Sequence, residues 1–240
     1  MPAGTPGAGD VCSGGHAETH RVVLHNGRPL ADGLALDREG FRFVRHDTKV
    51  ADFYDPAEIK RIYYPEMEAL VRRESGASRV VAFDHVLRTE NDELRETRKI
   101  QEVVRRVHND FTDWSASQCI RALMGDEAEA LLRGRFAIIQ VWRPIRRPVE
   151  TWPLAICDAR SPADGPIVEI QLDCGGTAQT YAINYDPDQR WYWFPRMCRD
   201  EALVFKVYEW LRDGRDRWTV HSAFDDPWPA RSAGLTHPGR

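Results

Sequence analysis

Apolar residues in two stretches of the chain recur every three or four positions, as they do along one face of a helix. Residues 55–76 begin with an aspartate that can cap a helix and a proline suited to its first turn, and Gly76 offers a stop. Residues 113–134 repeat the pattern, although the interior Gly125 weakens the continuity of that helix. One helix is therefore predicted over residues 55–76 and a second over residues 113–134.

Elsewhere the pattern mostly predicts strands, with alternating apolar and polar residues or short apolar runs between turns. The first predicted strands lie at residues 20–30, folded about a turn at Asn26-Gly27, and at residues 40–46 and 78–88. Later strands are predicted at 135–145, 149–161, 165–173, 178–186, 189–197 and 217–227, with a short helix over 199–213. Strands at this spacing, separated by Gly, Pro and Asp, are typical of a sandwich or a jelly roll.

The composition excludes several classes of function. Lys and Arg number 33 against 37 Asp and Glu, so the net charge is −4 and no basic field attracts nucleic acid. No apolar run is long enough to span a membrane. The five cysteines are scattered without a CxxC pair, which argues against a disulfide framework and favours a reducing cytoplasm.

We expect one domain preceded by a short leader. Residues 1–20 are rich in Gly, Pro and Ala but lack the order of a signal peptide, which predicts a disordered leader. Because no linker is visible after residue 20, residues 21–240 are interpreted as a single domain. Its N-terminal strands and helix occupy residues 21–100, and its functional core runs from 101 to 232 and onward.

The most informative short pattern is His108-Asn109-Asp110. If these residues lie in a strand, His108 and Asp110 point to the same face and Asn109 points away. One imidazole and one carboxylate are two of the three ligands of the facial triad that holds non-haem Fe(II) and leaves coordination positions open. A lone HxD is also a frequent chance pattern at a polar strand end, so the interpretation depends on a third ligand.

His221 is the best candidate for that ligand, because it ends a strand-like run just before a turn, where the rim of a barrel would lie. Arg231 follows ten residues later, next to Ser232. A guanidinium can hold a carboxylate through two parallel hydrogen bonds. An HxD, a distant histidine and an arginine ten residues beyond it form the pattern of 2-oxoglutarate-dependent Fe(II) oxygenases on a double-stranded β-helix. The alternative for His221 is a strand-end histidine with structural hydrogen bonds only.

Several segments spread over residues 33–232 also resemble a known family. They include DFYDPAEIKRIYYPEMEALV, GASRVVAFDHVLR, VHNDFT, WRPIRRPVETWPLAICDARS, WYWFPRMCRDEALVFKVY and HSAFDDP. These segments are similar to the CmcJ/AsaB family of 7-alpha-cephem-methoxylase P8-chain-like proteins and hydroxylase/desaturases, which resembles the Fe(II)/2-oxoglutarate oxygenases of secondary metabolism. The resemblance implies His108, Asp110 and His221 on iron and Arg231 on 2-oxoglutarate. The family has an acidic residue between this arginine and the following serine, whereas here Ser232 is adjacent and no closing strand is evident.

Two further arginines are candidates for binding an acidic substrate. Arg88 ends the predicted strand over 78–88, and Arg143 precedes the proline that ends the strand over 135–145. A structural salt bridge is the alternative for both. Asp84 and His85 are adjacent, so they would face opposite sides of a strand and could not easily share a metal.

Together these observations predict an α+β, mainly β protein, a double-stranded β-helix (a cupin-like jelly roll) with flanking helices. Its predicted function is that of an Fe(II), 2-oxoglutarate-dependent oxygenase that uses O2 to hydroxylate or desaturate a small molecule in the cytoplasm. A partner enzyme of the same pathway is a further candidate interaction. Two alternatives stay open: a non-catalytic accessory subunit or degenerate paralogue, and a cupin-like metal enzyme that needs no 2-oxoglutarate.

Overall fold

The computed structural model describes residues 18–146, 148–161, 167–171 and 179–225. Most of the predicted leader and both Arg231 and Ser232 lie outside these ranges. The strands are β1 (Leu24–Asn26), β2 (Phe41–Arg45), β3 (His108–Asn109), β4 (Ala137–Trp142), β5 (Leu154–Cys157), β6 (Ile167–Gln171), β7 (Gln179–Ile183), β8 (Trp191–Trp193), β9 (Glu201–Glu209) and β10 (His221–Ala223). The α-helices are α1 (Pro56–Glu58), α2 (Tyr64–Ser75), α3 (Asp92–Arg98), α4 (Asp113–Met124) and α5 (Ala128–Leu131).

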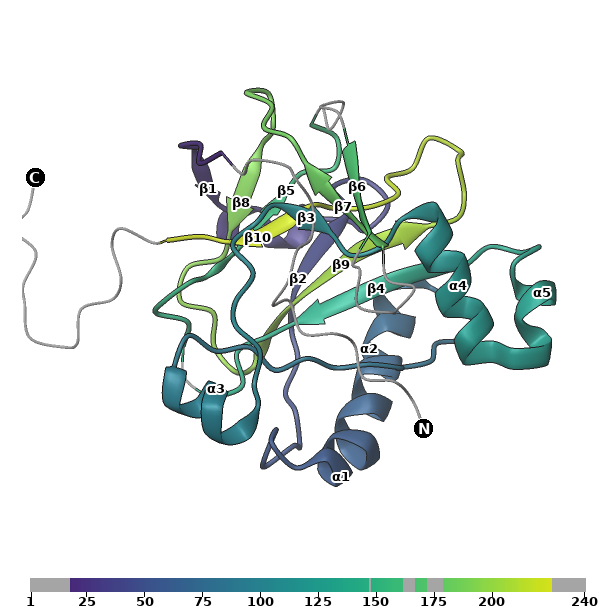
Figure 1. The fold of residues 1–240 in the computed structure, drawn as a ribbon, viewed down its shortest axis with the longest axis horizontal. Helices are drawn as coiled ribbons and strands as arrows, with labels where there is room; N and C mark the ends of the chain where they lie inside the picture. Colours follow the sequence, from purple (N-terminus) through teal and green to yellow (C-terminus); the bar gives the residue numbers. More distant parts are fainter. Residues whose placement is uncertain (1–17, 147, 162–166, 172–178, 226–240) are drawn as a thin grey trace, which may run out of the picture.

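These strands form two sheets of unequal size (Figure 1). The larger sheet has the order β1-β8-β5-β10-β3-β7-β6, and the smaller one has the order β2-β9-β4. β3 and β10 are neighbours in the larger sheet although more than a hundred residues separate them in the chain. A mainly β protein with a few flanking helices is thus confirmed.

The two sheets share one core. Ile156 of β5 belongs to the same buried cluster as Phe205 and Val207 of β9. The Asn109 side-chain amide of β3 also donates a hydrogen bond to the Val207 carbonyl at 3.0 Å. Residues of β3 and β5 therefore contact the smaller sheet.

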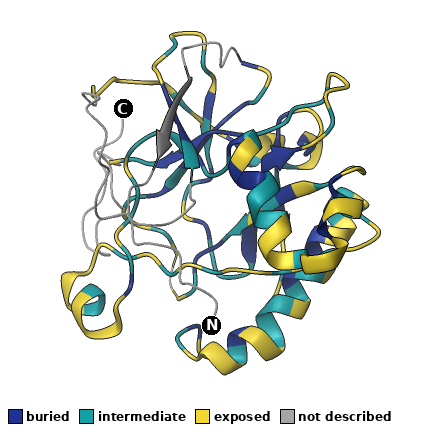
Figure 2. Ribbon diagram, turned by 45° about the vertical axis from the view of Figure 1, so that its right-hand side comes forward, coloured by how far each residue is buried: buried dark blue, intermediate teal, exposed yellow. Residues whose placement is uncertain are grey.

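Helix α2 covers the other side of the smaller sheet, where Met67 and Leu70 pack with Ala202 and Val204 of β9. Figure 2 shows the outer faces of the helices exposed to solvent and the strands behind them largely buried. No helix in the described part of the chain has both the length and the apolar character needed to cross a membrane.

The predicted helix over residues 199–213 is wrong, because residues 201–209 form strand β9. Every residue of β9 is buried, since one face meets the larger sheet and the other meets α2. A strand covered on both faces has apolar residues at successive positions instead of alternate ones, and such a run resembles a helix in sequence.

Two other predicted strands are wrong. The second strand of the predicted hairpin at residues 20–30 is replaced by a 3-10 helix, Arg28–Gly33, which has a proline in its first turn. Residues 78–88 form no strand, and their β-type pairing is limited to an isolated bridge between Arg88 and Gln101. Their backbone finds other partners, such as the Glu68 carboxylate of α2, which accepts a hydrogen bond from the Ala82 amide at 3.0 Å.

The other two predicted helices are confirmed in outline. Asp55 caps the first one through the Ala57 amide, a π-turn over Ile59–Tyr63 joins α1 to α2, and Gly76 ends α2 in the left-handed conformation. The second breaks at Gly125, which has a φ of +51° and starts a 3-10 turn between α4 and α5. Gly125 thus interrupts this helix, as its sequence position indicated.

Candidate metal centre

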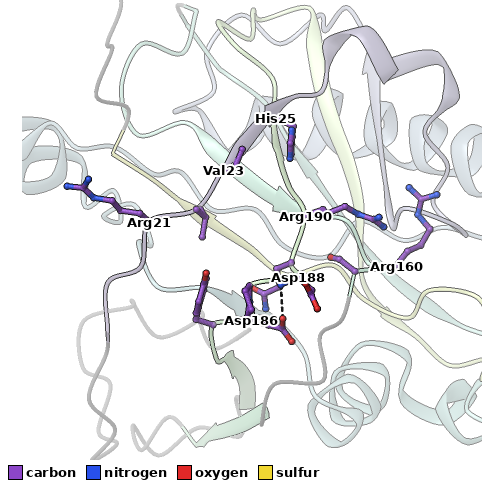
Figure 3. Close-up of a pocket in the computed structure, with 12 residues that line it drawn as sticks. Arg21, Val23, His25, Arg160, Asp186, Asp188 and Arg190 are labelled. Atoms are coloured by element: carbon purple, nitrogen blue, oxygen red, sulfur yellow. Dashed lines mark hydrogen bonds between the residues drawn. The ribbon is translucent and has the colours of Figure 1, made fainter.

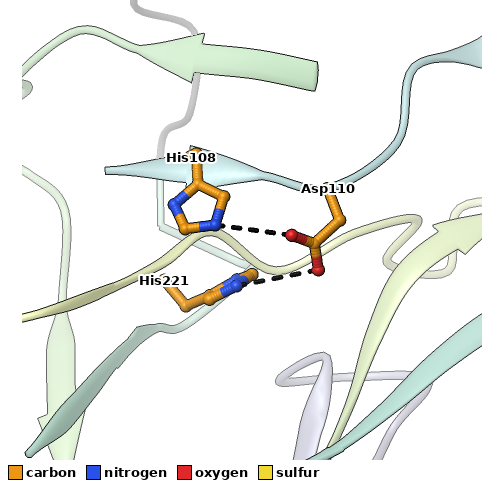
Figure 4. Close-up of side chains that lie close together, drawn as sticks. All are labelled: His108, Asp110 and His221. Carbon is orange, nitrogen blue, oxygen red and sulfur yellow. Dashed lines mark ion pairs between the residues drawn. The ribbon is translucent and has the colours of Figure 1, made fainter. Parts of the chain in front are cut away.

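His108 and His221 are brought together by strand pairing. β3 lies between β7 and β10, and the backbone of His108 stands directly opposite that of His221. Residues opposite each other in an antiparallel pair send their side chains to the same face of the sheet. The two imidazoles therefore lie side by side, with ring centres 4.4 Å apart (Figure 4).

Asp110 follows β3 at the point where the chain leaves the sheet for α4, whose first turn is capped by Thr112. Its carboxylate reaches both imidazoles: Oδ1 lies 3.4 Å from Nε2 of His108, and Oδ2 lies 3.7 Å from Nε2 of His221. One ligand atom from each of the three residues lies within 4.8 Å of the other two. The structure thus brings together all three residues that the sequence singled out as metal ligands.

The outer nitrogens of the two imidazoles are held by backbone carbonyls. Nδ1 of His108 lies 2.8 Å from the Arg106 carbonyl oxygen, and Nδ1 of His221 lies 3.4 Å from that of Thr219. A carbonyl oxygen only accepts, so Nδ1 carries the proton in both rings and Nε2 presents a lone pair. Two nitrogen lone pairs and a carboxylate therefore converge on one point. These electron-rich groups repel one another unless a cation lies between them.

The protonation states also suit a metal. Burial raises the pKa of Asp110, but His221, His108 and a hydrogen bond from Gln140 outweigh it and hold this pKa below its usual range. Burial, then the charges of His108 and Arg88, lower the pKa of His221 to about 4. His221 is therefore neutral at pH 7, and the hydrogen bond from Gln140 to the Asp110 carboxylate does not depend on its charge. Metal ligands must be deprotonated, as these two residues are.

The smaller sheet completes the surroundings of the triad with two residues that sequence reasoning missed. Gln140 of β4 donates a hydrogen bond from Nε2 to Oδ2 of Asp110 at 2.7 Å. Phe205 of β9 packs edge-on against the His221 ring, with ring centres 4.8 Å apart. The signal for Gln140 was a single polar residue inside the apolar run of a strand, AIIQVW, but nothing local linked it to Asp110.

Of the two candidate substrate-binding arginines, Arg88 lies near the triad. It is exposed, and its Nη1 donates to the Glu102 carbonyl oxygen at 2.7 Å. Partial desolvation lowers the pKa of Arg88, whereas the charge of Asp110 opposes that change. Arg88 and the triad thus interact electrostatically, and its exposed guanidinium remains accessible to a ligand.

The structure does not support a substrate-binding role for Arg143. This residue is only 8% exposed, and its Nη2 donates to the carbonyl oxygens of His46 and Arg199 at 2.6 and 2.5 Å. Its Nη1 lies 3.2 Å from Nδ1 of His46. The buried guanidinium joins the start of the segment after β2 to the turn before β9, which is a structural role.

Three other polar residues also have structural partners. Nδ1 of His85 lies 2.9 Å from the hydroxyl of Tyr64, and the Asp84 carboxylate accepts the His85 amide hydrogen bond. Asp158 is fully buried and holds Arg160 through two hydrogen bonds of 2.9 and 2.7 Å. None of the three lies in the described His-Asp-His cluster.

A separate open cavity of about 630 Å³ lies among residues 21–25, 160–161 and 185–190 (Figure 3). It contains none of the three triad residues. Two arginines on its wall, Arg160 and Arg190, are paired with the buried Asp158 carboxylate at 2.7 and 3.5 Å. Among the described residues, the triad is therefore a better candidate for the functional site than this cavity, although the cavity is large.

The chain is similar to characterised proteins over almost its whole length. A family model described as an oxidoreductase/YMDC permease-like domain matches residues 5–235. The "Fe(II)/2-oxoglutarate-dependent dioxygenase nvfI" of Aspergillus novofumigatus (strain IBT 16806) is 31% identical over 95% of this chain and 84% of its own length. The "hydroxylase/desaturase asaB" of Aspergillus flavus is 39% identical over 42% of this chain and 51% of its own.

A solved structure of the "iron and alpha-ketoglutarate-dependent endoperoxidase NvfI" superposes with a TM-score of 0.85. It is 30% identical, and the match covers 96% of this chain and 87% of that one. The chain and this structure are therefore similar both in amino-acid sequence and in fold, over nearly the whole of this chain.

Proposed function

The chain belongs to the family of Fe(II)/2-oxoglutarate-dependent dioxygenases and hydroxylase/desaturases with which it aligns, and on that premise we propose that His108, Asp110 and His221 are its iron ligands. The single observation that carries the proposal is the convergence of two Nε2 lone pairs and one carboxylate on a common point. Two neutral imidazoles and one carboxylate are the donor set of the Fe(II) facial triad. The residues present therefore fit the metal that the family uses.

The protein's own contribution is to hold these three donors in place around one point. Backbone carbonyls fix both imidazole tautomers, and Gln140 holds one oxygen of Asp110, as outer partners of metal ligands commonly do. When bound, Fe(II) and 2-oxoglutarate activate O2 and supply the oxidising power to remove hydrogen from a substrate C–H bond. Phe205 places an apolar ring against His221 and limits water on that side.

The proposed reaction is hydroxylation or desaturation of a small organic molecule of secondary metabolism, with O2 as cosubstrate. The names of the relatives support this class, and they differ among dioxygenase, hydroxylase/desaturase and endoperoxidase. We place Arg231 and Ser232 at the far carboxylate of 2-oxoglutarate, by analogy with the family pattern alone, since both lie outside the described residues. A partner enzyme that supplies the substrate belongs to the same proposal.

We also propose that the fold is a double-stranded β-helix, or jelly roll. Two facing sheets with a shared core and a metal triad at their interface support this assignment. A cytoplasmic setting is proposed from the cysteines, since Cys119, Cys157 and Cys198 are all free thiols.

The test is an anaerobic titration of the full chain with Fe(II), with and without 2-oxoglutarate, followed by the charge-transfer absorption of the metal–cosubstrate complex. We expect one Fe(II) per chain and the absorption band only when 2-oxoglutarate is present. Alanine at His108, Asp110 or His221 should abolish both signals. The Arg231→Ala variant should still bind Fe(II), and its affinity for 2-oxoglutarate should be lower.

The same titration separates the alternatives. Iron binding without any effect of 2-oxoglutarate would favour a cupin-like enzyme of another class or a non-catalytic accessory protein. Succinate release in air then distinguishes a 2-oxoglutarate-dependent enzyme from both. Unchanged iron stoichiometry in all three alanine variants would place the metal elsewhere.

A further inference from the structure

Arg88 is held in place by two neighbouring segments of the chain. The Thr89 amide donates to the Gln101 carbonyl at 3.0 Å, and the Gln101 amide donates to the Leu87 carbonyl at 3.1 Å. The Arg88 side chain then adds its own hydrogen bond from Nη1 to the Glu102 carbonyl at 2.7 Å. The backbone on both sides of the arginine and one end of its guanidinium are thus fixed before any ligand arrives.

The segment that holds Arg88 leads directly to the triad. Two residues beyond Glu102, the Val104 carbonyl accepts a hydrogen bond from the Ala223 amide of β10 at 2.8 Å. Ala223 is two residues from His221 on the same strand, and the segment itself continues into His108.

The guanidinium of Arg88 is not neutralised by a direct partner in the part of the chain that the structure describes. No carboxylate there lies within ion-pair distance of Arg88, and only its Nη1 has a hydrogen-bond acceptor. Other arginines near the same segment are paired, such as Arg105 with Glu102 and Arg79 with Glu127, each at 2.7 Å. Nε and Nη2 of Arg88, two donors on one edge of its guanidinium, therefore have no acceptor among the described residues and can bind a ligand.

We propose that Arg88 binds a carboxylate group of a ligand beside the metal centre, an inference that rests on the proposed function of that centre. A guanidinium edge with two free donors matches a carboxylate in shape and charge better than it matches a neutral oxygen. Two ligands of this enzyme class can supply the group, the cosubstrate 2-oxoglutarate and an organic substrate that is itself an acid. The experiment has one arm for each source.

The experiment uses the full chain loaded with Mn(II) under anaerobic conditions, with ligand binding followed by tryptophan fluorescence or calorimetry. In the first arm, 2-oxoglutarate is titrated into the wild type, Arg88→Gln and Arg88→Lys. In the second, benzoate and its neutral counterpart benzamide are titrated with 2-oxoglutarate already at saturation. Arg79→Gln is the matched control, because Arg79 lies in the same segment and pairs with Glu127 on the surface.

We expect Arg88→Gln to weaken carboxylate binding by about tenfold or more in one of the two arms, with partial recovery in Arg88→Lys because an ammonium keeps the charge but loses the fork. A loss in the first arm assigns Arg88 to 2-oxoglutarate. A loss of the preference for benzoate over benzamide in the second assigns it to an acidic substrate. Equal melting temperatures of the variants would show that the fold is intact.

A change of less than about twofold in both arms, at wild-type Mn(II) affinity, overturns the role of Arg88 and leaves the metal centre standing. An equal loss in Arg79→Gln also overturns it, since the effect would then be one of general surface charge. If the wild type binds no Mn(II), the metal-centre proposal fails, and the role of Arg88 fails with it.

Discussion

Replacing Gln140 by leucine tests whether the smaller sheet helps to organise the metal ligands. In the wild type, Nε2 of Gln140 lies 2.7 Å from Oδ2 of Asp110, and Oδ1 remains free to face the His108 imidazole. Leucine has a similar size but no donor. The Asp110 carboxylate would then be free to rotate, and binding a metal would have to restrict it again.

The size of the effect follows from the kind of hydrogen bond that is lost. A hydrogen bond to a charged group typically contributes about 1.5–3 kcal/mol, and outer partners of metal ligands typically change metal affinity by about 10–100-fold. Gln140 is exposed, so water can replace part of its contribution. We therefore expect the lower end of the range, a weakening of about tenfold or about 1.4 kcal/mol.

The assay is a Mn(II) titration, with free Mn(II) measured by electron paramagnetic resonance and the fold checked by thermal unfolding. Gln189→Leu is the control, since the Gln189 side chain also donates a hydrogen bond, at 3.2 Å to the Asn184 carbonyl, but lies outside the triad. Equal Mn(II) affinity in Gln140→Leu and the wild type would refute the reasoning. An equal loss in both variants would show a general effect of removing a surface amide.

Three further predictions follow from particular residues. Asp110→Asn removes the anionic ligand of the triad, and Mn(II) affinity should fall more than about a hundredfold, since losing the attraction between this carboxylate and the cation should cost about 3 kcal/mol or more; a smaller loss in the titration would argue against Asp110 as a ligand. Gly40→Ala should destabilise the fold by about 2–4 kcal/mol, because Gly40 has a φ of +85° and a Cβ there would lie 1.9 Å from Oγ1 of Thr219; an unchanged melting temperature contradicts this. Burial, and then the charge of Asp158, raise the pKa of Asp216 to about 6, so the fold loses stability as the pH rises from about 4 to 6, and this loss is complete above that range. Asp216→Asn should therefore unfold at higher denaturant than the wild type at pH 8, by on the order of 1 kcal/mol after solvent screening, and the difference should vanish near pH 4.

The sequence by itself determined the elements whose signals are local. Asp55, Pro56 and Gly76 mark the ends of the first helical region because capping and left-handed turns depend on one or two residues and their immediate neighbours. The expectation that His108 and Asp110 act together came from the two-residue repeat of a strand, and in the structure Asp110 lies just beyond the end of β3 with its carboxylate still close to His108. The distinctive segments that resemble the oxygenase family are likewise readable without a structure.

Only the tertiary structure decided which distant residues meet these local elements. Residues 201–209 form a strand because α2 and the larger sheet cover both of its faces. Those covering elements are distant in the chain, so the nine residues of the strand alone do not reveal them. The register of β10 against β3 brings His221, the third ligand expected from its strand-end position, beside His108, and the approach of β4 brings Gln140 to Asp110. Strand pairing depends on contacts between residues far apart in the chain, so the same local pattern is compatible with many partners until the fold selects one.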